Sequence, residues 1–138
     1  MKEKSNATLR RAASLRCRTD AAIERLGRNI SCYERGDITA GELLREASDA
    51  ADRAGNLELS EAELAATDSF GRSVNRKVKA YRGYARTAAR IAMGFKSDAV
   101  CRRKALELAH TAVRLGNRQM ARTCLLYTSP SPRDTERS

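Results

Sequence analysis

Residues 71 to 94 read GRSVNRKVKAYRGYARTAARIAMG. At about 100° per residue, five cations of this stretch fall on one face of a helix, and apolar residues in and beside it fall on the opposite face. The cations are Arg72, Arg76, Lys79, Arg86 and Arg90; the apolar residues are Phe70, Val74, Val78, Tyr81, Ala85, Ala88 and Ala92. The stretch therefore predicts a strongly amphipathic helix that carries a row of cations.

Two capping signals predict where the preceding helices begin. Thr39 with Glu42, and Ser60 with Glu63, have the spacing of capping boxes. The helix that starts at Ser60 either runs unbroken to residue 93 or breaks within TDSFG, residues 67 to 71, and we favour a break. Helical spacing also predicts a first helix from Ser5 or Asn6 to about Arg35, and a last one over residues 97 to 115, followed by another turn or two.

Composition sets the fold class. Leu, Ile, Val and Phe together make up 23 of the 138 residues, which is a small supply for a core. A further 23 residues are alanine, the best helix former, which adds little apolar area when it is buried. We therefore expect an all-α, antiparallel bundle of about four helices, alanine-rich and loosely packed, as a single domain over residues 1–123.

The last residues differ in character from this body. Residues 124 to 134, CLLYTSPSPRD, resemble one translated reading frame of an adapter used to build sequencing libraries. Both prolines of the chain lie here, and helical periodicity stops at about Cys124. The resemblance implies that residues 124–138 are a disordered, non-native tail and that the natural chain is truncated at its C-terminus.

Charge is distributed unevenly along the chain, whose net charge is +10. Residues 1–35 and 71–123 are basic, whereas residues 36–70 hold nine acidic and two basic residues. No acidic residue lies between Arg72 and Ser97. Either the acidic segment packs beside the basic ones and their fields partly cancel, or the basic helix presents a positive face to a partner.

Residues 63–81 resemble a helix-turn-helix DNA-binding unit. Glu63, Leu64 and Ala65 match its first helix, and the start of its second helix is matched by Arg72, Ser73, Asn75 and Arg76. The resemblance implies that these four side chains contact base edges and phosphates. The chain departs from the pattern because its turn is one residue short, Asp68 stands where an apolar residue is usual, and Ser69 replaces the turn glycine.

The basic face itself allows three interpretations: a solvated or protein-binding face, a nucleic-acid interface, and a membrane surface. The apolar side is mostly alanine and tyrosine, which makes a poor membrane anchor. Tyr81 and Tyr84 either stack on bases or belong to the core.

We expect no enzyme activity, no cofactor and no metal site. His110 is the single histidine, there is no phosphate-binding glycine loop, and Glu42, Glu46, Asp49 and Asp52 lack the histidines that paired metal sites add. The cysteines form no C-x-x-C pair, and no apolar run is long enough to span a membrane, so we expect a protein of the reducing cytoplasm.

These observations favour a small basic accessory protein that binds nucleic acid, DNA or RNA, mostly through backbone phosphates and with little sequence preference. The predicted binding residues are Arg72, Arg76, Lys79, Arg86, Arg90, Arg102, Arg103 and Lys104. The alternative is a helical interaction module that pairs acidic and basic helices, within a homo-oligomer or with an acidic protein partner.

Overall fold

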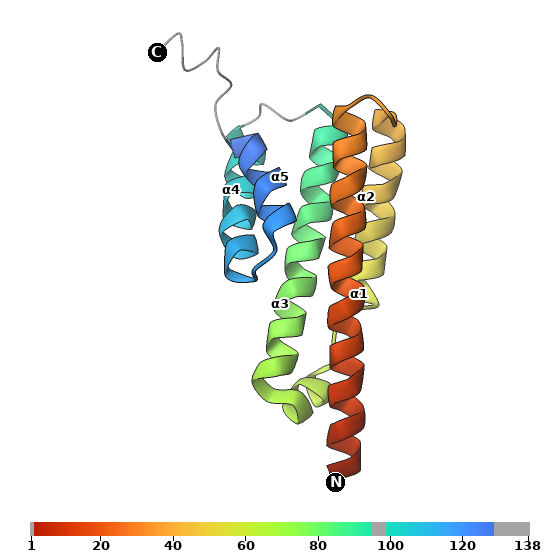
Figure 1. Cartoon of the computed structure of the whole chain (residues 1–138), viewed down its shortest axis with the longest axis vertical. Helices are drawn as coiled ribbons and strands as arrows, with labels where there is room; N and C mark the ends of the chain where they lie inside the picture. Colours follow the sequence, from red (N-terminus) through yellow and green to blue (C-terminus); the bar gives the residue numbers. More distant parts are fainter. Residues whose placement is uncertain (1, 95–98, 129–138) are drawn as a thin grey trace.

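The computed structural model describes residues 2–94 and 99–128. These residues form five helices and no strand: α1 (Lys2–Glu34), α2 (Ala40–Gly55), α3 (Glu61–Ala92), α4 (Ala99–Arg114) and α5 (Arg118–Thr128). Figure 1 shows α1, α2 and α3 side by side along the length of the molecule, with α4 and α5 as a shorter hairpin beside α3. Consecutive helices run in opposite directions. The predicted all-α bundle is confirmed, with one helix more than the four expected.

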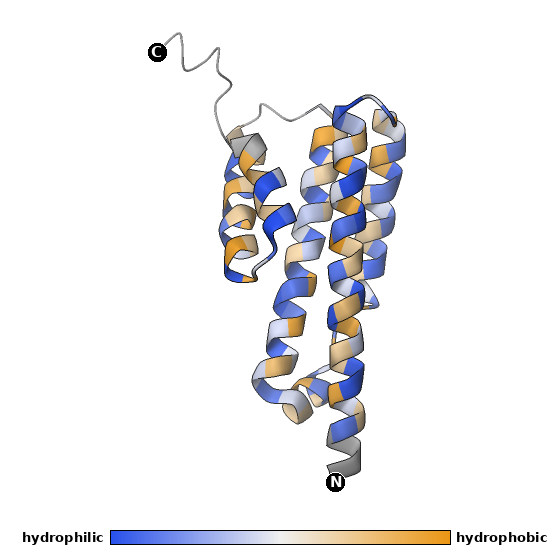
Figure 2. Cartoon of the chain, in the orientation of Figure 1, coloured by the Kyte–Doolittle hydropathy of each residue, from blue (hydrophilic) through white to orange (hydrophobic). Residues whose placement is uncertain are grey.

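Helix α3 is the central element because it contacts α1, α2 and α4. Its predicted apolar face is buried at Val74, Val78, Tyr81, Ala85 and Ala88. Hydrophilic and hydrophobic residues alternate along every helix, as expected of amphipathic helices (Figure 2). Eleven of the 26 residues in the buried cluster are alanines, so the core is alanine-rich as predicted. The looseness that we expect of this packing stays a prediction.

Both predicted capping boxes are present. The Thr39 hydroxyl accepts from the Glu42 backbone N–H at 3.1 Å, and the Glu42 carboxylate accepts from the Thr39 N–H at 3.2 Å. The second box pairs Ser60 with Glu63 in the same way, at 3.2 and 3.0 Å. These bonds satisfy N–H groups that a helix start leaves without intrahelical partners.

The N-terminal boundary differs from the prediction, since α1 begins at Lys2 rather than after Ser5 or Asn6. The chain beyond Asn117 also differs: α5 continues to Thr128, and Cys124 is buried in the core. The expected disorder is therefore wrong for residues 124–128, because α5 packs against α4 and α1. The rest of the predicted tail, residues 129–138, lies outside the described residues, as do Ser97 and Asp98, the predicted start of the last helix.

Helix α3 bends within TDSFG, where a break was favoured. Asp68 has φ 53° and ψ −128°, outside the helical region, and divides a short first segment from the long one. The two segments meet closely at buried Gly71: a Cβ added there would lie 1.8 Å from the Thr67 hydroxyl oxygen and 3.3 Å from Leu59 Cδ1. The Thr67 hydroxyl is itself held by the Glu63 carbonyl at 2.7 Å. The bend therefore requires a residue without a side chain at this position.

Gly71→Ala tests this requirement. Although alanine favours a helix over glycine by about 1 kcal/mol, we expect the variant to lower the free energy of unfolding by about 1–3 kcal/mol because the added methyl overpacks the bend. Gly83→Ala in the same helix is the control, since its Cβ would meet only Leu108 Cδ1, at 3.5 Å. We expect it to stabilise the protein. Urea unfolding followed by circular dichroism measures both, and a stabilising Gly71→Ala would contradict the role of the bend.

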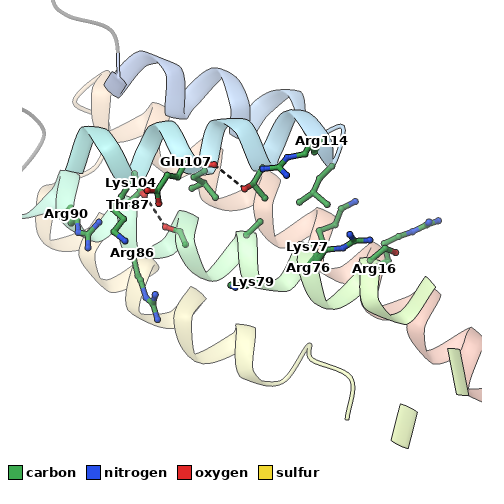
Figure 3. A pocket seen from close by; sticks show the side chains of 16 residues that line it. Arg16, Arg76, Lys77, Lys79, Arg86, Thr87, Arg90, Lys104, Glu107 and Arg114 are labelled. Carbon is green, nitrogen blue, oxygen red and sulfur yellow. Dashed lines mark hydrogen bonds between the residues drawn. The ribbon is translucent and has the colours of Figure 1, made fainter. Parts of the chain in front are cut away.

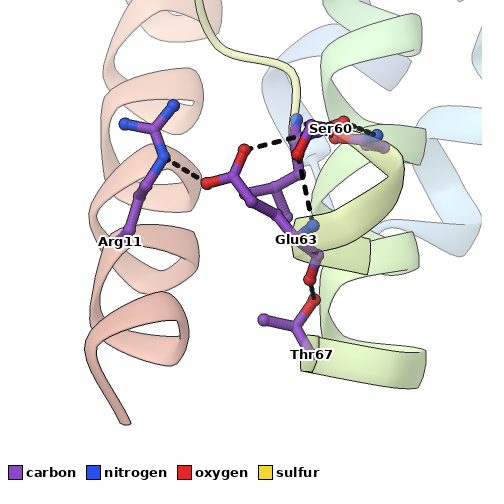
Figure 4. A network of polar contacts seen from close by, with 6 residues as sticks. Arg11, Ser60, Glu63 and Thr67 are labelled. Carbon is purple, nitrogen blue, oxygen red and sulfur yellow. Dashed lines mark hydrogen bonds and ion pairs between the residues drawn. The ribbon is translucent and has the colours of Figure 1, made fainter. Parts of the chain in front are cut away.

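Glu63 also connects α3 to α1 (Figure 4). Its carboxylate accepts from the Ser60 backbone N–H at 3.0 Å and from Arg11 Nε at 2.5 Å. The bond from the Ser60 N–H, followed by the Arg11 guanidinium, holds the pKa of Glu63 below its ordinary value of 4.5. A lowered folded-state pKa means that the carboxylate stabilises the fold above the unfolded-state pKa and loses this effect as the pH falls through the folded-state value.

We therefore expect Glu63→Gln to destabilise the protein at pH 7, and the difference from wild type to shrink as the pH falls below about 4.5. Urea unfolding between pH 7 and pH 3 measures the difference. Glu61→Gln, an exposed position in the same helical turn, provides the control and should change stability little. A Glu63→Gln effect of equal size at every pH would show that the charge is not responsible.

Candidate nucleic-acid interface

A groove of about 760 Å³ lies between α3 and α4, and one residue of α1, Arg16, also lines it (Figure 3). Its lining includes Ala80 and Gly83 of α3 and Leu108 of α4. A Cβ at Gly83 would lie 3.5 Å from Leu108 Cδ1, at ordinary van der Waals distance, so the two helices are close together here. Small residues on α3 and a leucine on α4 therefore give the groove an apolar floor.

Cationic side chains dominate the remaining lining. Eight of them and a single carboxylate, that of Glu107, belong to the described lining. The cations are Arg16 from α1; Arg76, Lys77, Lys79, Arg86 and Arg90 from α3; and Lys104 and Arg114 from α4. Charges of one sign that line a concave surface reinforce one another and attract counterions of the opposite sign. The groove is thus a strongly positive surface.

Most of these cations have no acidic partner. Lys77 pairs with Asp20 at 2.7 Å, and its side chain is 15% exposed. For the other seven, the described part of the chain places no carboxylate within ion-pair distance. The carboxylates of the acidic middle segment that do pair with basic residues, Glu46, Glu58 and Glu63 among them, pair with arginines outside the groove.

The structure brings together five of the eight predicted binding residues. Arg76, Lys79, Arg86, Arg90 and Lys104 line the groove. They come from α3, where the cations share one face, and from the first turns of α4, which runs antiparallel beside it.

The other three predicted residues lie outside the groove. Arg72 pairs with Asp68, one turn earlier, at 3.0 Å. It lines a second, shallow hollow beside the bend, which shares Arg76 and Lys79 with the groove. Arg102 and Arg103 are exposed on α4. Arg102 points away from the groove, whereas Arg103 lies one helical turn before Glu107, beyond the end of the lining.

Three cations of the groove were not predicted: Arg16, Lys77 and Arg114. Arg114 follows Glu107 by seven residues, so helical spacing in α4 could have placed it on the same side. Lys77 lies off the predicted face, towards Asp20 of α1. For Arg16 the sequence carries no signal, because its position depends on how α1 packs against α3.

The helix-turn-helix interpretation loses two of its contact residues. The Asn75 side chain accepts from the Leu59 backbone N–H at 2.8 Å and donates to the Leu59 carbonyl at 3.1 Å. Ser73 donates to the Phe70 carbonyl at 2.6 Å. Both side chains thus fix the chain around the bend, and their polar groups are committed to its backbone rather than free for base edges.

Tyr81 and Tyr84 are core residues, with 1% and 0% of their surface exposed. Burial raises the pKa of both phenols. The alternative that these rings stack on bases is therefore wrong, because neither ring reaches the surface.

The described residues include no group of His, Cys, Asp and Glu side chains that could hold a metal ion. None of the helices among them combines the length and the hydrophobicity needed to cross a membrane.

Comparison with protein families, with curated proteins and with solved structures gives no match for this chain.

Proposed function

We propose that this protein binds nucleic acid through backbone phosphates, without catalysis, and that the groove between α3 and α4 is the binding site. The observation that carries the proposal is the convergence of eight cations from three helices on one groove, seven of them without an acidic partner in the described chain. Phosphates are the anions that such a surface attracts most strongly when they are repeated along a chain.

The energetics of this binding follow from counterion release. A protein that neutralises phosphates frees the cations condensed on the nucleic acid, so its affinity falls steeply as salt rises. We assume that about five of the groove's cations contact phosphates. A plot of the logarithm of the association constant against the logarithm of the salt concentration should then have a slope of about −3.5 for a single strand or −4.5 for a duplex. Such binding favours no base sequence.

The second candidate function is a protein-interaction module. Its supporting observation is that Asp49 and Asp52 of α2 are exposed, and no basic side chain of the described chain pairs with them. A second copy or an acidic partner would then occupy the groove in place of nucleic acid. Under either candidate, a reducing cytoplasm stays our prediction for the compartment.

Fluorescence anisotropy with labelled random-sequence DNA and RNA tests the proposal. We expect the variant Arg76→Gln, Lys79→Gln, Arg86→Gln to bind at least tenfold more weakly than wild type. The salt slope should fall by about 2.1 for a single strand and about 2.7 for a duplex, since each phosphate contact accounts for about 0.7 or 0.9 of it.

The control variant, Arg18→Gln, Arg28→Gln, Arg102→Gln, removes the same charge from exposed positions outside the groove. It should bind nearly as well as wild type. An equal loss in both variants would mean that only net charge matters. Wild-type affinity that is independent of salt, or no binding at all, would refute the proposal, and size-exclusion chromatography would then test the second candidate.

A further inference from the structure

We infer that the groove receives one single phosphodiester chain, rather than the face of a duplex, and that it holds this chain without regard to its bases. The inference rests on the proposed function and specifies its ligand.

The placement of the charges supports a single chain. Cations from α3 and α4 stand on both sides of an apolar floor, and Arg16 adds a further charge at the end marked by Arg76 and Lys77 (Figure 3). The two walls of the groove belong to neighbouring helices, whose axes typically lie about 8–10 Å apart. A duplex is wider than its own major groove, which is about 12 Å across. It could therefore reach only the cations at the rim, whereas a single chain can lie along the groove.

The length of the groove also suits a short run of nucleotides. Arg76 and Arg90 are separated by 14 residues of α3, which is about 21 Å at 1.5 Å per residue. Positive grooves that follow a single strand cover from about four nucleotides upwards.

The lining offers little that could recognise a base. It contains no aromatic side chain among the described residues, so the stacking that most single-strand sites use is absent from this surface. Its hydroxyls are engaged within their own helices: Thr87 donates to the Gly83 carbonyl and Thr111 to the Glu107 carbonyl, both at 3.1 Å, and Ser73 is bound to Phe70. The arginines of the lining can also contact bases, but with no ring and no free hydroxyl donor beside them in the described lining the phosphates should supply most of the binding free energy.

Three fluorescent probes of equal length test the inference at fixed salt: a 12-nucleotide thymidine strand, a 12-unit abasic strand with the same phosphodiester backbone, and a 12-base-pair duplex. We expect the abasic strand to bind within threefold of the thymidine strand and the duplex at least tenfold more weakly. Duplex binding as tight as single-strand binding would overturn the inference while leaving the proposed function intact. A tenfold loss with the abasic strand would also overturn it, whereas failure of all three probes would refute the proposed function itself.

Two substitutions in α4 locate the strand. Thr111→Glu puts a negative charge into the groove, and Val113→Glu puts one on the opposite, exposed side of the same helix, outside the lining. We expect the first variant to bind the thymidine strand at least tenfold more weakly and the second to lose less than threefold. Equal losses, with unchanged circular dichroism for both, would place the strand outside the groove and overturn the inference.

Discussion

The burial of one face of α3 is the constraint on which the rest of the structure depends. Val74, Val78 and Tyr81 need apolar surroundings, which α1, α2 and the α4–α5 hairpin supply. The side chains of a helix have fixed angular positions relative to one another, so burial of the apolar face also determines where the arginines and lysines point. The positive groove is thus a geometric consequence of how the core forms, and the bend at Asp68 sets where the long segment of α3 begins.

Burial of the apolar face of α3 also brings like charges together in the groove. Seven cations held near one another without acidic partners repel, which costs stability that the buried core must offset. The chain contains carboxylates that could relieve this repulsion, yet the described structure pairs Glu46, Glu58 and Glu63 with arginines elsewhere. Ion pairs at exposed positions contribute little to stability. Apart from Arg16, which lies over the Phe70 ring at 5.2 Å, these cations gain no ion pair or ring contact in the described structure, which supports the proposed binding role.

Sequence patterns predicted the local features of this fold well. The two capping boxes, the buried face of α3 and the bend near Asp68 each follow from residues a few positions apart, so local chemistry decides them. The start of α1, the order of residues 124–128 and the membership of Arg16 in the groove could not be predicted, because tertiary contacts decide them. Arg72 was predicted to bind because it lies on the same face of the helix as the other cations. It is outside the groove because it lies beside the bend, where it pairs with Asp68.

The central claim is that the cations of α3 and α4 bind a phosphate chain between them. Amide chemical-shift mapping of the ¹⁵N-labelled protein, titrated with a short thymidine strand, tests it most directly. The account predicts saturable shifts concentrated in residues 76–90 and 104–115, with little change in α2. Shifts centred on α2, or on the side of α4 that carries Arg102 and Val113, would contradict it.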